Sequence, residues 1–238
     1  MVKISGHRGY KGKEIENSKS ALLRAIDEKL DYVEIDIRVS ADNVPVLFHD
    51  KRINRLLNGS GKVHKYTLQE LKNFRYGDGQ SILTLKEMFS LTKGKIQLIL
   101  DIKAKHIESL VLNLIRECEM ENEIIIQSFR GKIIQRFHNL EPNLSYCLYR
   151  ACIGKYFRPH KFFAQIFYNK LIKPYPAVYV SLDGPFMYDA FINLLKKNDK
   201  KVILGAMKLE NYLDKIEEWN IDIVNADDPS KVKKFLDI

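Results

Sequence analysis

The 238-residue sequence has few cysteines and no long apolar run. Its three cysteines (Cys118, Cys147 and Cys152) form no CxxC pair and no Cys/His ladder, which excludes a disulfide framework and a zinc-ribbon site. No apolar run of roughly 18 residues occurs without a charge, and the N-terminus turns polar at once, so we expect neither a spanning helix nor a signal peptide. These features predict a cytoplasmic protein with reduced thiols.

The chain also lacks an internal linker. No Pro/Gly/Ser-rich segment, low-complexity tract or repeat divides it, and 45% of its residues are hydrophobic, so we expect a single domain over residues 1–238. A chain of this length buries roughly 70–75% of its unfolded surface and needs no metal or disulfide to build a core. The 39 basic and 30 acidic residues give a net charge of +9, which favours anionic partners without choosing among nucleic acid, lipid and phosphorylated metabolite.

Short β-branched runs alternate with amphipathic helical patterns along the whole chain. The helical patterns include residues 17–29, with Asn17 as the expected N-cap, and residues 106–120. Eight repeats of strand and helix predict an α/β fold, a (β/α)8 TIM barrel of parallel strands. A further run, residues 44–48, comes too soon after the second strand for a helical crossover, so we interpret it as a short hairpin extension. The predicted barrel strands are residues 2–6, 32–38, 97–102, 123–127, 144–149, 177–181, 201–205 and 222–225.

Two carboxylates interrupt the hydrophobic pattern of the second predicted strand. Val33, Ile35 and Ile37 share one face, so Glu34 and Asp36 share the other. A packed barrel interior favours apolar side chains, and like charges this close repel unless a proton or cation lies between them. A hard divalent cation is the simplest remedy. The alternative is an edge strand whose second face is in water, where paired acids cost nothing.

Further polar side chains end neighbouring strands. Asp101 and Lys103 repeat the same spacing at the C-terminal end of the third strand, where TIM barrels carry their active sites. His7 ends the first strand and His49 ends the hairpin run; either alone is typical of a structural or surface histidine. Beside the carboxylates they suit cleavage of a phosphate ester, and Arg8 offers a guanidinium fork for the phosphoryl group. The other histidines, His64, His106, His138 and His160, have no such neighbours and are assigned no chemistry.

The strings that carry these residues resemble the signature of the glycerophosphodiester phosphodiesterase family. HRGY, IENS, DYVEIDIRVSADN and VPVLFHD are similar to the family's HRG, PENT, GAD-x-I-E-x-D-V with T-K-D-G, and V-V-x-H-D. The stretches GSGKVHKYTLQEL, ILTLKEMF, LILDIKA, IIIQSF and ADDP are also similar to family motifs. The resemblance therefore covers nearly the whole chain and is weakest over residues 140–220.

The resemblance implies a (β/α)8 barrel, hydrolysis of glycerophosphodiesters to an alcohol and glycerol phosphate, and dependence on Mg²⁺ or Ca²⁺. An attacking hydroxyl would come either from water or from the substrate's own glycerol 2-OH. By position in the motifs, Glu34, Asp36 and Asp101 would hold the metal ion, His7 and His49 would form the acid/base pair, Arg8 and Lys103 would bind the substrate phosphate, and Glu16 would orient Arg8. An alternative for Glu16 is an ordinary acid in the first turn of a helix, where the helix dipole favours it.

The sequence departs from the family pattern at two places that bear on the site. Asp101 replaces the usual Glu, which shortens that ligand by one methylene and can shift metal geometry or ion preference. Residues 203–207 (ILGAM) stand where relatives carry a W-T-V-N-like string near the seventh strand. Because that strand end helps to line the pocket, the choice of substrate is open.

A basic aromatic stretch extends over residues 142–182, which contain no Asp or Glu and six Lys or Arg residues. We expect residues 150–173 to contact an anionic membrane surface or a glycerol phosphate polymer, because cationic and aromatic side chains at a barrel mouth suit such partners. The alternative is a barrel helix with a solvated basic face. No nucleic-acid-binding fold signature accompanies the stretch, so a nucleic-acid partner is not expected.

Three functions are compatible with the sequence. The leading hypothesis is metal-dependent hydrolysis of glycerophosphodiesters with histidine acid/base catalysis. A phospholipase D-like barrel acting on lysophospholipid or sphingolipid is a second, although such secreted enzymes usually carry a signal peptide and disulfides. A non-catalytic barrel that binds an anionic ligand is a third, and retention of both histidines with Glu34 and Asp36 argues against it.

Overall fold

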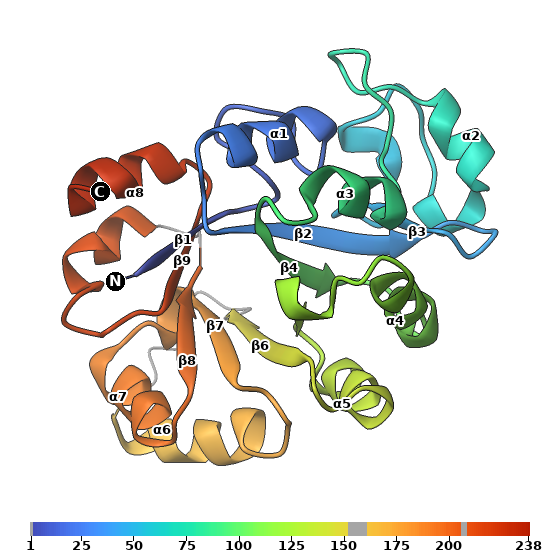
Figure 1. Ribbon diagram of the computed structural model, residues 1–238. Helices are drawn as coiled ribbons and strands as arrows, with labels where there is room; N and C mark the ends of the chain where they lie inside the picture. Colours follow the sequence, from blue (N-terminus) through green and yellow to red (C-terminus); the bar gives the residue numbers. More distant parts are fainter. Residues whose placement is uncertain (1, 152–160, 206–208) are drawn as a thin grey trace.

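The computed structural model describes residues 2–151, 161–205 and 209–238, which form a closed barrel of parallel strands ringed by helices (Figure 1). The sheet order is β1-β9-β8-β7-β6-β5-β4-β2-β3, and pairing of β1 with β2 closes the barrel. The predicted TIM barrel with a hairpin extension is confirmed, because β3 pairs antiparallel with β2 outside the closed ring. The strands are β1 (Lys3–Gly6), β2 (Tyr32–Val39), β3 (Pro45–Leu47), β4 (Gln97–Ile102), β5 (Ile124–Ser128), β6 (Ser145–Ala151), β7 (Tyr179–Asp183), β8 (Lys201–Leu204) and β9 (Ile223–Ala226).

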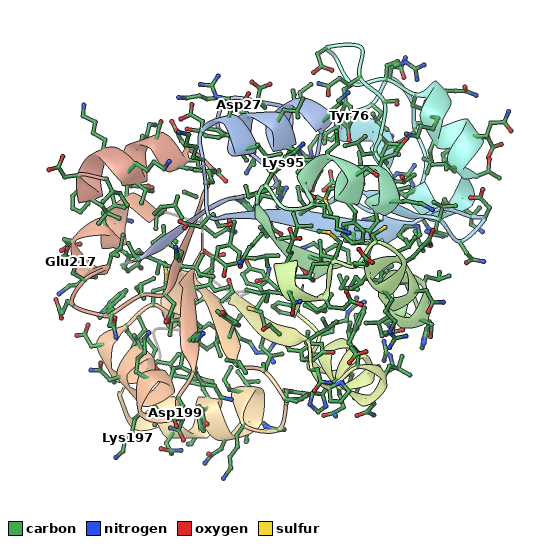
Figure 2. The ribbon with its side chains drawn as sticks, viewed as in Figure 1. Asp27, Tyr76, Lys95, Lys197, Asp199 and Glu217 are labelled. Carbon is green, nitrogen blue, oxygen red and sulfur yellow. The ribbon has the colours of Figure 1, made fainter. Side chains whose placement is uncertain are left out.

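Helices follow the strands and cover the outside of the barrel. They are α1 (Lys19–Asp27), α2 (Leu68–Asn73), α3 (Leu85–Thr92), α4 (Glu108–Glu117), α5 (Gly131–Leu140), α6 (Lys161–Phe167), α7 (Asp189–Lys197) and α8 (Pro229–Leu236). Exposed residues such as Asp27, Lys197 and Glu217 lie at the periphery, on the far side of the helical layer from the strands (Figure 2). The amphipathic pattern of the chain therefore places apolar helix faces on the sheet and charged faces in water.

The predicted start of the first helix was wrong. We expected Asn17 to cap residues 17–29, but α1 begins at Lys19 and the Ser18 hydroxyl accepts the capping hydrogen bond from the Ala21 amide. Asn17 has a left-handed backbone (φ 56°) and its side chain binds Asp36 instead. The second pattern, residues 106–120, holds the shorter helix α4.

Strand alternation divides the side chains between an outer apolar layer and the barrel interior. Residues such as Val33, Ile35 and Ile37 face the helices and are fully buried. The interior has an apolar floor, and the next inward position along each strand that contributes to it, two residues further, lines a pocket and is polar except at Gly205. The floor comprises Ile99, Ile125, Cys147, Tyr179, Ile203 and Ile223, with Tyr32 packed against them.

An excursion between β3 and α3 extends the barrel mouth. Its short helical turns, Ile53–Arg55 and Val63–Lys65, and helix α2 pack around a second hydrophobic cluster that includes Phe48. Thr67 and Thr84 begin α2 and α3 with capping boxes, in which each threonine pairs with the glutamate three residues on. This packing fixes the chain on both sides of His49, because Phe48 and Ile53 both belong to the cluster.

Candidate active site

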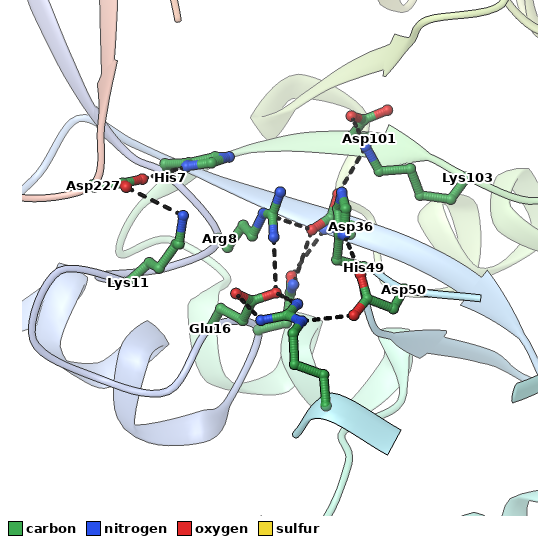
Figure 3. Close-up of polar contacts among 12 residues, drawn as sticks. His7, Arg8, Lys11, Glu16, Asp36, His49, Asp50, Asp101, Lys103 and Asp227 are labelled. Atoms are coloured by element: carbon green, nitrogen blue, oxygen red, sulfur yellow. Dashed lines mark hydrogen bonds and ion pairs between the residues drawn. The ribbon is translucent and has the colours of Figure 1, made fainter. Parts of the chain in front are cut away.

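A polar pocket opens at the carboxyl ends of the barrel strands, directly above the apolar floor. All the residues predicted for the site except Glu16 line it, and Glu16 lies behind Arg8 (Figure 3). The lining residues are His7, Arg8, Glu34, Asp36, His49, Asp101, Lys103, Gln127, Tyr149, Ser181, Asp183, Gly205 and Asn225. The sequence-predicted set is thus brought together, while the role of each member stays a prediction.

Three buried carboxylates form the centre of the pocket. Glu34 and Asp36 both point inward from β2, and Asp36 lies opposite Asp101 in the β2–β4 register. One oxygen from each carboxylate lies within 4.8 Å of the others, and each residue is at most 3% exposed. The alternative of a wet edge strand is therefore wrong.

The carboxylates carry more negative charge than their partners neutralise. Lys103 Nζ lies 2.5 Å from Asp101 Oδ2 and 3.0 Å from Asp36 Oδ1, and Arg8 Nε lies 3.4 Å from Asp36 Oδ2. Burial and the neighbouring Asp36 raise the pKa of Glu34 to about 7. Burial also raises the pKa of Asp101, and its Oδ1 has no hydrogen-bond partner among the described residues. Oxygen donors this close, buried and under-neutralised fit a hard divalent cation.

His7 is held by an aspartate from the other end of the chain. Its Nδ1 lies 2.5 Å from Asp227 Oδ1 (Figure 3). Its Nε2 lies 3.9 Å from Glu34 Oε2. Burial opposes the charged form of His7, but the hydrogen bond to Asp227 and the charge of Glu34 raise its pKa overall. Burial likewise opposes ionisation of Asp227, yet the contacts with His7 and Lys11 lower its pKa to about 2. The contact therefore favours the protonated form of His7 beside an ionised Asp227.

His49 has the opposite electrostatic setting. Its Nδ1 lies 2.7 Å from Asp50 Oδ1, and Asp50 in turn accepts from Arg55 Nε at 2.7 Å. Burial lowers the pKa of His49 and outweighs the attraction of Asp36 and Asp50. The Arg38 guanidinium donates to the His49 backbone carbonyl, at 2.8 Å from Nε and 2.5 Å from Nη2. The pKa values of the two histidines are thus shifted in opposite directions, so that His7 favours the protonated form and His49 the neutral form.

Arg8 is positioned by a tight turn and a buried glutamate. Its backbone is left-handed (φ 54°), and its amide donates to Glu34 Oε2 at 3.0 Å. Glu16 is 4% exposed and accepts from Arg8 Nη1 at 2.8 Å and from Arg55 Nη2 at 2.6 Å. The alternative for Glu16, an acid in the first helical turn, is wrong because it precedes α1 and its cap.

Several residues of the site were missed by sequence reasoning. Asp227 stands in the ADDP string that the family resemblance contained, and Asn17 stands in IENS, where its amide donates to Asp36 Oδ2 at 2.9 Å. The Tyr149 hydroxyl donates to Asp183 Oδ2 at 2.7 Å on the far side of the pocket. A Cβ at Gly205 would lie 2.3 Å from Asp183 Oδ1, so the glycine of ILGAM makes room for this carboxylate. Residues 206 and 207 of that string lie outside the described residues.

Of the basic aromatic stretch over residues 142–182, the structure describes residues 142–151 and 161–182, whereas residues 152–160 lie outside the described residues. Arg150 is 7% exposed and donates to the carbonyls of Phe129 and Leu171, which makes it a structural residue. Lys170 and Lys173 are exposed. A membrane or polymer contact through residues 150–173 stays a prediction. Over the described part of the chain, no helix has the length and apolar character needed to cross a membrane.

Comparison with known proteins gives consistent matches over nearly the whole chain. The sequence profile of the glycerophosphoryl diester phosphodiesterase family matches residues 7–231. The chain is 26% identical over 243 residues to the Bacillus subtilis protein YhdW, covering 97% of this chain and 96% of YhdW. It is 24% identical over 246 residues to a glycerophosphodiester phosphodiesterase of Caldanaerobacter subterraneus, covering 95% of this chain and 94% of that protein.

Among solved structures, an Oleispira antarctica phosphodiesterase in complex with the product sn-glycerol-3-phosphate superposes with a TM-score of 0.84. The two are 21% identical, and the match covers 100% of this chain and 98% of the other. This likeness independently supports the barrel fold.

Proposed function

Because the chain belongs to the glycerophosphoryl diester phosphodiesterase family, we propose that it hydrolyses glycerophosphodiesters to an alcohol and glycerol phosphate. The family makes it a phosphoric diester hydrolase. The observation that carries the proposal is the meeting of three buried carboxylates, two differently tuned histidines and two cations in one pocket.

In this proposal Glu34, Asp36 and Asp101 hold a divalent cation, Mg²⁺ or Ca²⁺. When bound, the ion neutralises phosphate oxygens and polarises the phosphorus centre. The support is the charge balance: among the described residues, Lys103 and Arg8 contact Asp36 or Asp101, Arg8 is shared with Glu16, and Glu34 has His7 Nε2 at 3.9 Å. Those two cations would contact the remaining phosphate oxygens, and Glu16 would keep Arg8 in place through its 2.8 Å bond to Nη1.

The two histidines would move protons at the two ends of the scissile bond. His49, with its lowered pKa, is the proposed general base that takes a proton at Nε2 from the attacking hydroxyl, while Asp50 fixes its tautomer at Nδ1. His7, with its raised pKa, is the proposed general acid that gives a proton from Nε2 to the departing alkoxide. The attacking hydroxyl is water or the substrate's glycerol 2-OH, and release of a cyclic phosphate would identify the latter.

Some finer expectations stay predictions beside this proposal. They are a role in lipid metabolism, the single domain over residues 1–238, and the cytoplasmic location inferred from the cysteine content. Cys118 and Cys147 are free thiols among the described residues. The alternative function is a phospholipase D-like activity on lysophospholipid or sphingolipid, and the substrate panel described next distinguishes it from glycerophosphodiester hydrolysis.

The test is release of the headgroup alcohol, such as choline, from a panel of glycerophosphodiesters, lysophospholipids and sphingolipids, with the phosphate-bearing product identified as glycerol phosphate, lysophosphatidate or ceramide phosphate. We expect turnover of glycerophosphodiesters that a chelator removes and Mg²⁺ or Ca²⁺ restores. His7→Ala and His49→Ala should each abolish turnover, whereas His138→Ala, whose partly buried ring packs on Tyr146 and does not line the pocket, should not. Turnover restricted to lysophospholipid or sphingolipid would favour the phospholipase D-like alternative, and chelator-resistant turnover would contradict the metal site.

A further inference from the structure

A second pocket lies immediately beside the catalytic one and is lined by cations. Its charged or titratable side chains are Arg38, Lys51, Lys62, His64 and Lys105, and no Asp or Glu lines it. Val39, Val63 and Ala104 form its apolar walls. Its volume of about 430 Å³ falls in the range of small-molecule sites, whereas the catalytic pocket offers about 60 Å³. A whole glycerophosphodiester therefore has to extend beyond the catalytic pocket.

The same chain segments build both pockets. Arg38 follows Asp36 by two residues along β2, so strand alternation keeps both side chains on the inward face, with Arg38 nearer the mouth. Lys51 follows His49 by two residues, and Lys105 follows Lys103 by two. Arg38 lines the second pocket and donates to the carbonyl of His49, which lines the catalytic pocket, so this contact joins the walls of the two pockets.

The cations of this second pocket lack the carboxylate partners that cations have elsewhere at the mouth. Arg8, Lys103 and Arg55 each pair with Asp or Glu. Among the described residues, none of the five side chains of the second pocket has an acidic oxygen within 4.0 Å. Arg38 is half-buried and donates Nε and Nη2 to one neutral carbonyl, while Asp36, Asp50 and Asp101 attract it only from beyond contact distance. A half-buried guanidinium with no carboxylate in contact has donors left for the oxygens of a bound anion.

We propose that this pocket is a subsite for a second phosphoryl group of the substrate. The proposal rests on the proposed function, and it narrows the substrate class to glycerophosphodiesters with a second phosphate on the side of the scissile bond that faces His49. That phosphate is either a terminal monoester on a small alcohol or the next diester of a glycerol phosphate chain. Both present oxygens that Arg38 and the lysines can bind.

The activity test uses three substrates built on one skeleton: glycerophosphoglycerol, its terminal phosphomonoester, and a linear chain of three glycerols joined by two phosphodiesters. Both halves of glycerophosphoglycerol are glycerol, so an added phosphate can reach the pocket whichever half departs. We expect the wild-type kcat/KM to be at least about tenfold higher for one or both of the doubly phosphorylated substrates. The preferred one then identifies a small phosphorylated alcohol or a polymer as the source.

Charge reversal at two exposed lysines removes the preference. Lys51→Glu/Lys62→Glu should bring the doubly phosphorylated substrates down to the rate of glycerophosphoglycerol, whose own kcat/KM stays unchanged. The matched control is Lys197→Glu/Lys234→Glu, which has the same charge change at exposed lysines in the last turns of α7 and α8, at the opposite end of the barrel. Equal losses in both double variants, or no wild-type preference, would overturn the subsite.

A binding measurement separates this inference from the proposed function. Calorimetric titration of inorganic phosphate into the whole protein should show one bound phosphate fewer in Lys51→Glu/Lys62→Glu than in the wild type and in the control. If no substrate is hydrolysed but this loss is seen, the proposed function fails and the anion subsite stands. If the number of bound phosphates is the same in all three proteins, the subsite is refuted.

Discussion

Replacing Asp227 by Asn tests the electrostatic division between the two histidines. The amide keeps the size of the side chain but removes the charge 2.5 Å from His7 Nδ1. Hydrogen bonds to charged groups contribute roughly 1.5–3 kcal/mol. Because the Asp227 side chain is 46% exposed, solvent screening reduces this to about 1 kcal/mol. That free energy lowers the pKa of His7 by about 0.7, at 1.36 kcal/mol for each factor of ten.

The sign of the pH effect follows from the role of His7 as the acid. An acid works only while it is protonated, so activity declines as the pH rises through its pKa. Asp227→Asn should therefore move the alkaline limb of the kcat/KM profile to lower pH by about 0.7. At pH values above the pKa of His7, the protonated fraction of His7 should fall about fivefold. The acidic limb, set by His49, should stay in place.

The assay records kcat/KM from about pH 5 to pH 9 with two substrates. One releases an alkyl alcohol, which needs a proton as it leaves, and one releases p-nitrophenol, which does not. The deficit of Asp227→Asn should appear with the first and nearly vanish with the second. Lys11→Ala, which removes the other cation at Asp227, is the control and should leave the alkaline limb unmoved. An unmoved limb in Asp227→Asn, or equal deficits with both substrates, would refute the assignment.

Three further substitutions test the supporting geometry. Asp101→Asn should raise the Mg²⁺ or Ca²⁺ concentration needed for half-maximal activity at least about tenfold, because one proposed carboxylate ligand is lost. In chelator, thermal unfolding of this variant should show no loss of stability, because the repulsion of Asp101 by the other two carboxylates is gone. Glu16→Gln should cost roughly 3 kcal/mol in urea unfolding, since it leaves Arg8 and Arg55 without their shared carboxylate; a loss under about 1 kcal/mol would contradict the buried network. Gly205→Ala should displace the Asp183 carboxylate and lower kcat/KM, with a stability loss of about 1–3 kcal/mol; wild-type kinetics would show that this carboxylate does not shape the pocket.

Local patterns predicted the barrel and the inward-facing acids well. The period of two in β2 separates Val33, Ile35 and Ile37 from Glu34 and Asp36, and the structure keeps that separation. Strand order then brings Asp101 beside Asp36. These relations depend only on alternation and on neighbouring strands, which sequence spacing records.

The contacts that sequence reasoning missed depend on distant or competing partners. Asp227 binds His7 across a separation of 220 residues, and it lies just beyond the end of β9, where strand alternation no longer fixes the direction of a side chain. Asn17 and Ser18 can both cap a helix, and the choice is made by the buried Asp36, which takes the Asn17 amide. The second pocket arises only when the excursion folds Lys62 and His64 over the end of β2.

The two-layer interior of the barrel separates the residues that stabilise the fold from those that face the substrate. Each of β4 through β9 gives one side chain to the floor and, two residues later, one position to the layer that lines the pocket; this position is polar in five of the six strands, as at Asp101, and is Gly205 after β8. Substitutions in the polar layer can therefore change chemistry or specificity while the packing beneath is kept. Tyr149, Asp183 and Gly205 are such positions: a substitution there alters the wall of the pocket and leaves the six floor residues unchanged.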